Sequence, residues 1–74
     1  MDYDTGKIDE MVLALLWLTL HDEVRAWKGH DWDAMDRLFQ KGYIHDPKGK
    51  AKSVVLTEEG LKRSEELFKR YFSR

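Results

Sequence analysis

The chain contains no cysteine and only one proline among its 74 residues. Without cysteine it has no disulfide, no thiolate metal site and no thiol nucleophile, a composition that suits the reducing cytoplasm. Long apolar runs are also missing: residues 11–18 are far too few to span a bilayer, and the acidic N-terminus lacks the basic region of a signal peptide. We therefore expect a cytoplasmic protein with no membrane segment.

Large apolar side chains, in contrast, are plentiful. Hydrophobic residues make up 42% of the chain and include three Trp, three Tyr and three Phe. This is enough apolar surface for a folded core, although the length lies near the lower limit for folding without disulfides or metals. No linker or repeat divides the chain, so we expect one domain over residues 1–74.

The charges are distributed unevenly along the chain. Residues 1–36 carry nine acidic and three basic side chains, a net charge of −6, whereas residues 37–74 carry ten basic and five acidic ones, a net charge of +5. Halves of opposite sign attract each other within a monomer or between protomers. The alternative is that both are ordinary solvated faces.

A first helix is predicted to begin at Asp4 or Thr5, either of which can cap it, with Asp9 and Glu10 near its positive end. Two apolar stripes run along it at helical spacing. The first consists of Ile8, Met11, Val12, Leu15, Leu16 and Thr19; the second consists of Leu13, Trp17 and Leu20. A helix that is apolar on two sides needs two covers. We expect the second stripe to form a homodimer face; the alternative is that the C-terminal helix covers it.

The rest of the chain alternates between strand and helix signals. Residues 23–28 either extend the first helix or form a short strand, and we favour the strand. Asp31 is predicted to cap a helix over residues 32–41, and Gly42 provides its left-handed C-terminal residue. The core stripe of that helix is expected to be Trp32, Met35, Leu38 and Phe39.

A hairpin and a last helix follow. Tyr43 and Ile44 begin a strand, residues 46–49 have strong turn chemistry, and residues 53–56 return as a second strand. Thr57 is predicted to cap the last helix. Its buried face is expected to be Leu61, Ser64, Leu67, Phe68, Tyr71 and Phe72.

This order of helix, short strand, helix, β-hairpin and helix predicts an α+β domain of the winged-helix-like class, with the hairpin as the wing. The hairpin region ends in Leu-Thr-Glu-Glu-Gly at residues 56–60. It resembles the wing of MarR- and PadR-type winged-helix regulators over about a third of the chain.

A second resemblance spans nearly the full length. It is carried by Lys7-Ile-Asp-Glu, Leu18-Thr-Leu-His-Asp, Arg25-Ala-Trp-Lys-Gly, Asp31-Trp-Asp and the segment from residue 49 to residue 60. On these residues the chain is similar to the small bacterial proteins of domain-of-unknown-function family 6429. The resemblance implies the same compact scaffold and brings no known catalytic or binding residues.

Basic residues around the wing are the candidate contacts for nucleic acid or an acidic partner. They are Lys48, Lys50, Lys52, Arg25 and Lys28. The alternative for the wing lysines is protection of a strand edge against aggregation. Acidic residues at positions 31, 33 and 36 disfavour entry of the helix at 31–41 into a DNA groove, because they would repel phosphates.

Nothing in the sequence indicates a catalytic or cofactor site. The three histidines each precede an aspartate, which suggests a metal protein as a third hypothesis, but their spacing does not bring them together. Core packing is expected for Trp17, Trp27 and Trp32, with Trp27 the least suited to full burial. We therefore expect a non-enzymatic protein–protein interaction or adaptor module that acts as a homodimer with an unidentified partner. The alternative is a small nucleic-acid-binding transcriptional regulator that uses the basic wing.

Overall fold

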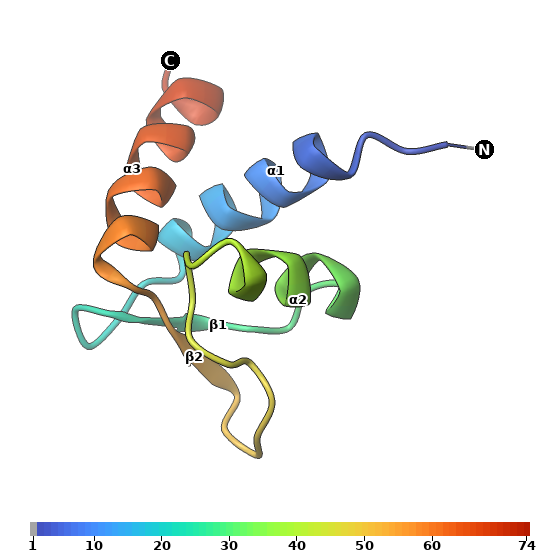
Figure 1. The fold of residues 1–74 in the computed structure, drawn as a ribbon. Coiled ribbons are helices and arrows are strands. Elements are labelled where there is room, and N and C mark those ends of the chain that lie inside the picture. The colour runs from blue at the N-terminus through green and yellow to red at the C-terminus, as the bar shows by residue number, and fades with distance from the viewer. Residues whose placement is uncertain (1) are drawn as a thin grey trace.

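The computed structural model describes residues 2–74 and shows a small α+β domain (Figure 1). Its elements in chain order are α1 (Thr5–Leu18), β1 (Arg25–Trp27), α2 (Trp32–Gln40), β2 (Ser53–Val55) and α3 (Glu58–Phe72). The two strands lie at one end of the molecule, and the loop that precedes β2 projects away from the helices. None of the helices in residues 2–74 has the length and apolar character needed to cross a membrane.

Each helix begins at a residue whose side chain accepts a hydrogen bond from the backbone three positions later. Asp4 accepts from the N–H of Lys7 at 3.0 Å, Asp31 from Ala34 at 3.1 Å, and Thr57 from Gly60 at 3.0 Å. Such side chains satisfy donors that a helix start leaves free. The predictions of Asp31 and Thr57 as caps are confirmed, and Asp4 rather than Thr5 caps α1.

The C-terminal end of α2 also follows its local sequence. Gly42 adopts φ +82°, and its N–H donates to the carbonyl of Phe39 at 3.0 Å. The next N–H, of Tyr43, reaches back to Leu38 at 3.1 Å. These two bonds form a Schellman motif, which needs a left-handed residue that glycine adopts without strain.

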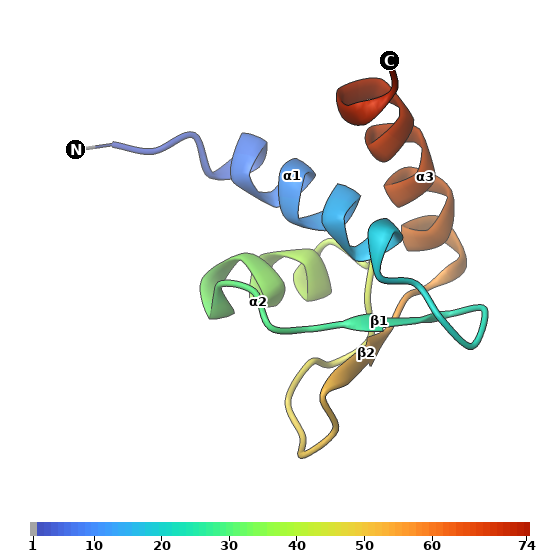
Figure 2. The ribbon, with the colours of Figure 1, turned by 180° about the vertical axis from the view of Figure 1, so that it is seen from behind.

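Helix α1 lies at the centre of the fold, in contact with α3, α2 and β1 (Figures 1 and 2). The buried cluster between these elements consists of Leu13, Ala14, Leu16, Ala26, Met35, Leu38, Ile44, Val54, Leu56 and Leu67. Leu13 is only 1% exposed, whereas Ile8 and Thr19 of the other predicted stripe are exposed. The α1 face that points into the domain therefore includes Leu13, a member of the second stripe, which was expected to form a dimer face.

The sheet pairs differently from the predicted hairpin. β2 pairs antiparallel with β1, with Ala26 opposite Val54 and Trp27 opposite Ser53. The segment expected to be the other hairpin strand makes only one bridge, between Ile44 and Leu56, together with a bond from the N–H of His45 to Val55 at 2.9 Å. Pro47 follows closely and has no N–H to donate, so a ladder cannot continue through it.

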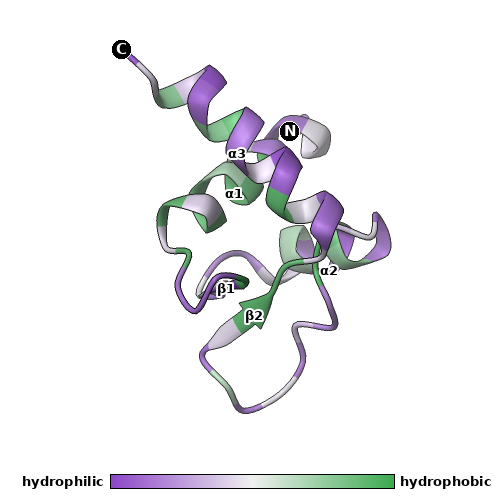
Figure 3. Ribbon diagram, turned by 90° about the vertical axis from the view of Figure 1, so that its left-hand side faces the viewer, coloured by the Kyte–Doolittle hydropathy of each residue, from purple (hydrophilic) through white to green (hydrophobic). Residues whose placement is uncertain are grey.

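The predicted strand at residues 23–28 is confirmed as β1. Most of β2 is apolar, whereas the loop that precedes it is mostly polar (Figure 3). Three aromatic predictions are wrong. Trp27, which was expected to pack in the core, is 48% exposed on β1. Trp32 is 62% exposed and Phe72 is 42% exposed, so neither belongs to the core. Since successive helical residues are about 100° apart, Trp32 lies roughly 110° from the centre of the buried α2 face. That face consists of Ala34, Met35 and Leu38.

Candidate functional site

Trp27 lies on the outer face of the sheet. Successive residues of a strand point to opposite faces, and in β1 Ala26 is fully buried while its neighbour Trp27 is 48% exposed. The indole of Trp27 lies against Gly29: a Cβ at position 29 would collide with Nε1 and lie 2.9 Å from Cε2. The absence of a side chain at Gly29 thus allows the indole to take this position.

Lys28 ties the loop before β2 to the connection between β1 and α2. Its ammonium group donates to the carbonyl of Pro47 at 2.6 Å and to that of Gly49 at 3.1 Å. Its backbone N–H donates to Lys52 at 3.1 Å, which continues the pairing of β1 with β2 by one residue. We call residues 45–52 the wing; in Figure 2 it projects below the sheet.

A groove of about 310 Å³ lies between the wing and the β1–α2 connection. We call it the wing groove. It is lined by Trp27, Lys28, Gly29, His30, Trp32, Gly49, Lys50, Ala51 and Lys52. The fold thus brings two exposed tryptophans and two exposed lysines, Lys50 and Lys52, to one surface.

The positive charge of the wing groove is not neutralised within residues 2–74. The ion pairs within residues 2–74 are formed by Arg37, Lys41, Arg63 and Lys69, and none of them involves a wing lysine. The ammonium group of Lys28 meets neutral carbonyls rather than a carboxylate. The groove therefore carries uncompensated positive charge.

His30 contributes a buried polar atom to the same place. Its Nε2 is buried and has no hydrogen-bond partner among the described residues. Burial lowers the pKa of His30, because it disfavours the charged imidazolium. His30 therefore lines the groove as a neutral residue at neutral pH.

The predicted basic residues divide into two groups. Lys28, Lys50 and Lys52 line the wing groove, whereas Lys48 is exposed on the wing outside it. Arg25 is exposed on β1 two residues from Trp27, and therefore on the same face of the sheet. The expected contact of these five residues with nucleic acid or an acidic partner stays a prediction.

The exposed side of α2 is acidic, as the sequence predicts. Asp33 and Asp36 are exposed, and Asp31 is occupied as the helix cap. A second hollow, of about 450 Å³, lies between the start of α1 and the start of α2. It is lined by Tyr3, Thr5, Ile8, Asp31, Asp33 and Arg37.

The residues expected to form a dimer face do not share one exposed surface. Leu13 is buried in the core, while Trp17 and Leu20 are partly buried and Leu20 packs against the core. The reason is that α3 packs against α1 and takes part of the apolar surface that a second copy was expected to cover. Leu13 therefore cannot contribute to a surface face.

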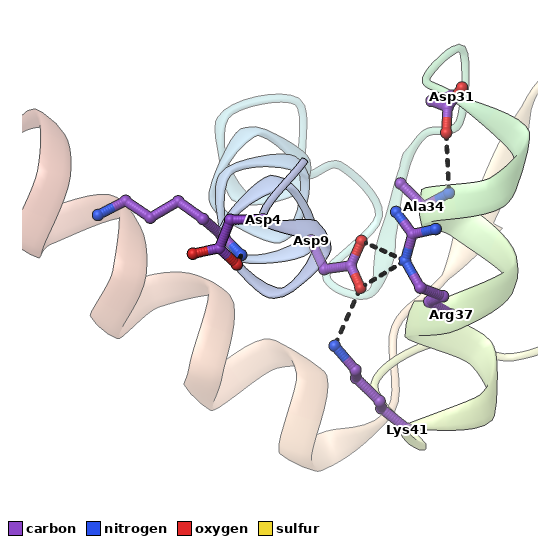
Figure 4. A network of polar contacts seen from close by, with 7 residues as sticks. Asp4, Asp9, Asp31, Ala34, Arg37 and Lys41 are labelled. Carbon is purple, nitrogen blue, oxygen red and sulfur yellow. Dashed lines mark hydrogen bonds and ion pairs between the residues drawn. The ribbon is translucent and has the colours of Figure 1, made fainter. Parts of the chain in front are cut away.

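Sequence reasoning missed one buried ionic network. Asp9, 1% exposed, points from α1 toward α2 (Figure 4). Arg37 Nε donates to both carboxylate oxygens at 2.9 and 2.8 Å, and Lys41 Nζ donates to one at 2.9 Å. Burial alone would raise the pKa of Asp9, but the hydrogen bonds and charges of the two cations outweigh it and lower the pKa.

A sequence signal for this network exists. Asp9, Leu13 and Leu16 are spaced i, i+4 and i+7, so the aspartate shares a helix face with two buried leucines. Lys41, the C-cap of α2, follows Arg37 by four residues. An acidic residue in a buried stripe needs a cation, and an i, i+4 pair on a neighbouring helix can supply two. Asp9 thus joins α1 to α2 rather than serving the helix end.

The three histidine–aspartate pairs do not converge. Within residues 2–74 no three His, Cys, Asp or Glu side chains are grouped so that they could hold a metal ion. His21 Nδ1 lies 3.0 Å from the carbonyl of Thr19, whereas His30 lines the wing groove. The metal hypothesis gains no site from the fold.

Comparisons with known proteins agree with the full-length resemblance. Residues 4–74 match the family described as "Domain of unknown function (DUF6429)". The chain is 64% identical over 74 residues, covering the whole of both chains, to "Uncharacterized protein y4hR" from Sinorhizobium fredii (strain NBRC 101917 / NGR234). No solved structure matches the chain. The predicted resemblance to this family is confirmed.

Proposed function

Given that this chain belongs to the family described as Domain of unknown function (DUF6429), we propose that it is a non-enzymatic nucleic-acid-binding module of the winged-helix type. The binding surface in this proposal is the wing groove with its exposed tryptophans and lysines. This places the regulator hypothesis ahead of the adaptor hypothesis.

The arrangement of elements supports the winged-helix assignment. β2 lies between β1 and the segment around Ile44, so the backbone order is β1, β2 and then the chain that enters the wing. α2 is the helix that leads into the wing, and α1 and α3 pack against each other above the sheet (Figure 1). A winged-helix protein uses a comparable loop near the nucleic-acid backbone.

The observation that carries the proposal is the shared position of Trp27, Trp32, Lys50 and Lys52 around one groove. Lysine ammonium groups neutralise phosphates, and exposed aromatic rings stack on bases. In a sequence of net charge −1, a local positive surface with two indoles is the place where a polyanion would be attracted.

The composition of the groove also supports a binding role over a catalytic one. Its nine lining residues include no carboxylate, hydroxyl or thiol side chain. Lys28 is held by two carbonyls, and Nε2 of His30 is buried. A nucleophile beside an oriented base, the usual arrangement for covalent catalysis, is not formed by the residues that line this groove.

A titration of labelled DNA and RNA tests the proposal. The anisotropy of random-sequence duplex and single-stranded probes is measured with the full chain at about 50 mM and about 200 mM salt. If Lys50 and Lys52 contact phosphates, this rise in salt should weaken single-strand binding about sevenfold. The double variant Lys50→Gln, Lys52→Gln should bind more weakly and with less salt dependence.

The matched control is Lys62→Gln, which removes an exposed charge from α3, outside the groove lining. It should leave affinity nearly unchanged. Absence of binding to any probe at low salt would reject the proposal, and equal losses in the double variant and the control would reject the groove as the site.

Self-association is a second candidate, favoured by the second hollow. Tyr3 is 69% exposed and Ile8 36% exposed at its edge, and exposed apolar groups next to charges are typical of protein interfaces. Sedimentation over a range of protein concentrations tests it. A dimer that uses α1 as predicted should be weakened by Trp17→Glu, whereas one that uses the hollow should be weakened by Ile8→Glu.

A further inference from the structure

We propose that the wing groove binds single-stranded rather than duplex nucleic acid, with bases stacked on Trp27 and Trp32 and the backbone held by Lys50 and Lys52. This inference rests on the proposed function and specifies its ligand. It follows from the geometry of the aromatic side chains, the placement of the lysines and the charge of α2.

The two indoles provide stacking surfaces that a fully paired duplex cannot use. Trp27 is 48% exposed and lies against Gly29, and Trp32 is 62% exposed in the first turn of α2. Both line the same groove. Bases in a duplex are already stacked on one another, whereas those of a single strand can stack on protein aromatic rings.

The lysines are placed to follow a backbone beside these rings. Lys50 and Lys52 are separated by one residue, and both are exposed, line the groove and lack a carboxylate partner within residues 2–74. Lys28 has a different role, because its ammonium group already donates to Pro47 and Gly49. It positions the wing, while the other two lysines remain available to phosphates.

The charge of α2 opposes duplex binding. In winged-helix readers of duplex DNA, the helix before the wing enters the major groove. Here that helix exposes Asp33 and Asp36, which would meet the phosphates on both sides of a groove.

An acidic peptide shares the negative charge but offers no flat rings to two indoles. Nucleic acid supplies a phosphate and a base in every residue, and so matches both features of the groove. The aromatic variants distinguish these ligands, because loss of a stacking surface weakens binding of bases specifically.

The test compares three probes under identical low-salt conditions with the full chain. These are a labelled single strand of about 12 nucleotides, within the usual site sizes of single-strand binders, a duplex of the same sequence, and polyglutamate as a competitor. The expected result is at least tenfold tighter binding of the single strand than of the duplex. Polyglutamate should compete weakly.

Trp27→Leu and Trp32→Leu test the stacking. Trp32 is 62% exposed and Trp27 48% exposed, and neither belongs to the buried core cluster or packs against it, so the variants should keep the circular dichroism spectrum and unfolding midpoint of the parent. Each should weaken single-strand binding about tenfold. Phe72→Leu is the control, since Phe72 is an exposed aromatic on α3 outside the groove, and it should bind like the parent.

The outcomes separate the inference from the proposed function. Duplex binding as tight as single-strand binding would overturn the single-strand inference and leave nucleic-acid binding standing. No binding of either probe would overturn both. Unchanged single-strand affinity in both tryptophan variants, or equal competition by polyglutamate, would show that charge alone drives binding and would overturn the stacking mode.

Discussion

Gly60, in the first turn of α3, packs directly against the backbone of Tyr43. A Cβ at position 60 would collide with the carbonyl oxygen of Tyr43 and lie 2.7 Å from its carbonyl carbon. The adjacent cap reinforces this contact, because the Thr57 hydroxyl donates to the carbonyl of Gly42 at 2.7 Å and the Thr57 N–H donates to Tyr43 at 3.0 Å. The Leu-Thr-Glu-Glu-Gly segment thus joins α3 to the chain that enters the wing.

Gly60→Ala should therefore destabilise the protein although alanine favours helices. The added methyl group meets backbone atoms that cannot rotate away, so α3 must shift, at a cost of about 1–3 kcal/mol. Urea unfolding measures the loss. Glu59→Ala, at an exposed neighbouring position, should change stability by less than about 0.5 kcal/mol, and equal effects of the two variants would contradict the packing explanation.

Asp9→Asn should also reduce stability, because it removes the charge shared by Arg37 and Lys41. The two cations are partly solvated, with side chains 32% and 45% exposed, so the loss is expected to be about 1–3 kcal/mol, less than for a fully buried pair. Asp36→Asn, an exposed aspartate of α2, is the control for denaturant unfolding. An unchanged midpoint for Asp9→Asn would mean that the network contributes no net stability.

The same carboxylate should give the protein an acid-dependent loss of stability. The pKa of Asp9 is lowered in the fold relative to an ordinary value of about 3.9. Its stabilising contribution is therefore fully present above pH ~4 and is lost as the pH falls through the folded pKa, since the unfolded chain binds the proton first. The difference in unfolding free energy between the parent and Asp9→Asn should shrink over this range; a constant difference would contradict the assignment.

Gly29→Ala should displace the indole of Trp27 without disrupting the fold. The new methyl group would occupy the space of Nε1, but the ring is the end of a half-exposed side chain that can move outward. We expect a changed indole N–H chemical shift for Trp27 and weaker binding of a single-stranded probe. Gly6→Ala is the control, because its Cβ would make only an ordinary 3.5 Å contact with Asp4.

Much of the secondary structure follows from residues close together in the sequence. The caps at Asp31 and Thr57 and the left-handed Gly42 were predictable, because each depends on bonds or dihedral angles within a few residues. The strand at Arg25–Trp27 was also expected, but its ladder is formed with residues 53–55, far along the chain. The α+β order followed from the succession of helix and strand signals, and the family resemblance from motifs spread over nearly the whole chain. Local signals of this kind do not depend on how the elements later pack.

The candidate site depended on tertiary structure. Trp32 fitted an apolar spacing, yet α2 turns its buried face along Ala34, Met35 and Leu38 and leaves the indole in solvent. Whether Leu13 faced a partner or the core depended on where α3 docks.

The sequence by itself determined where α2 and α3 begin, that α2 ends before Gly42, that the wing is basic and that the exposed side of α2 is acidic. Only the tertiary structure decided that β2 pairs with β1, that Asp9 is buried between two cations, and that Trp27, Trp32 and the wing lysines meet at one groove. The physical reason is that a helix cap is satisfied within one turn of chain. A groove is formed by segments about twenty residues apart, and their approach is set by the packing of the whole core.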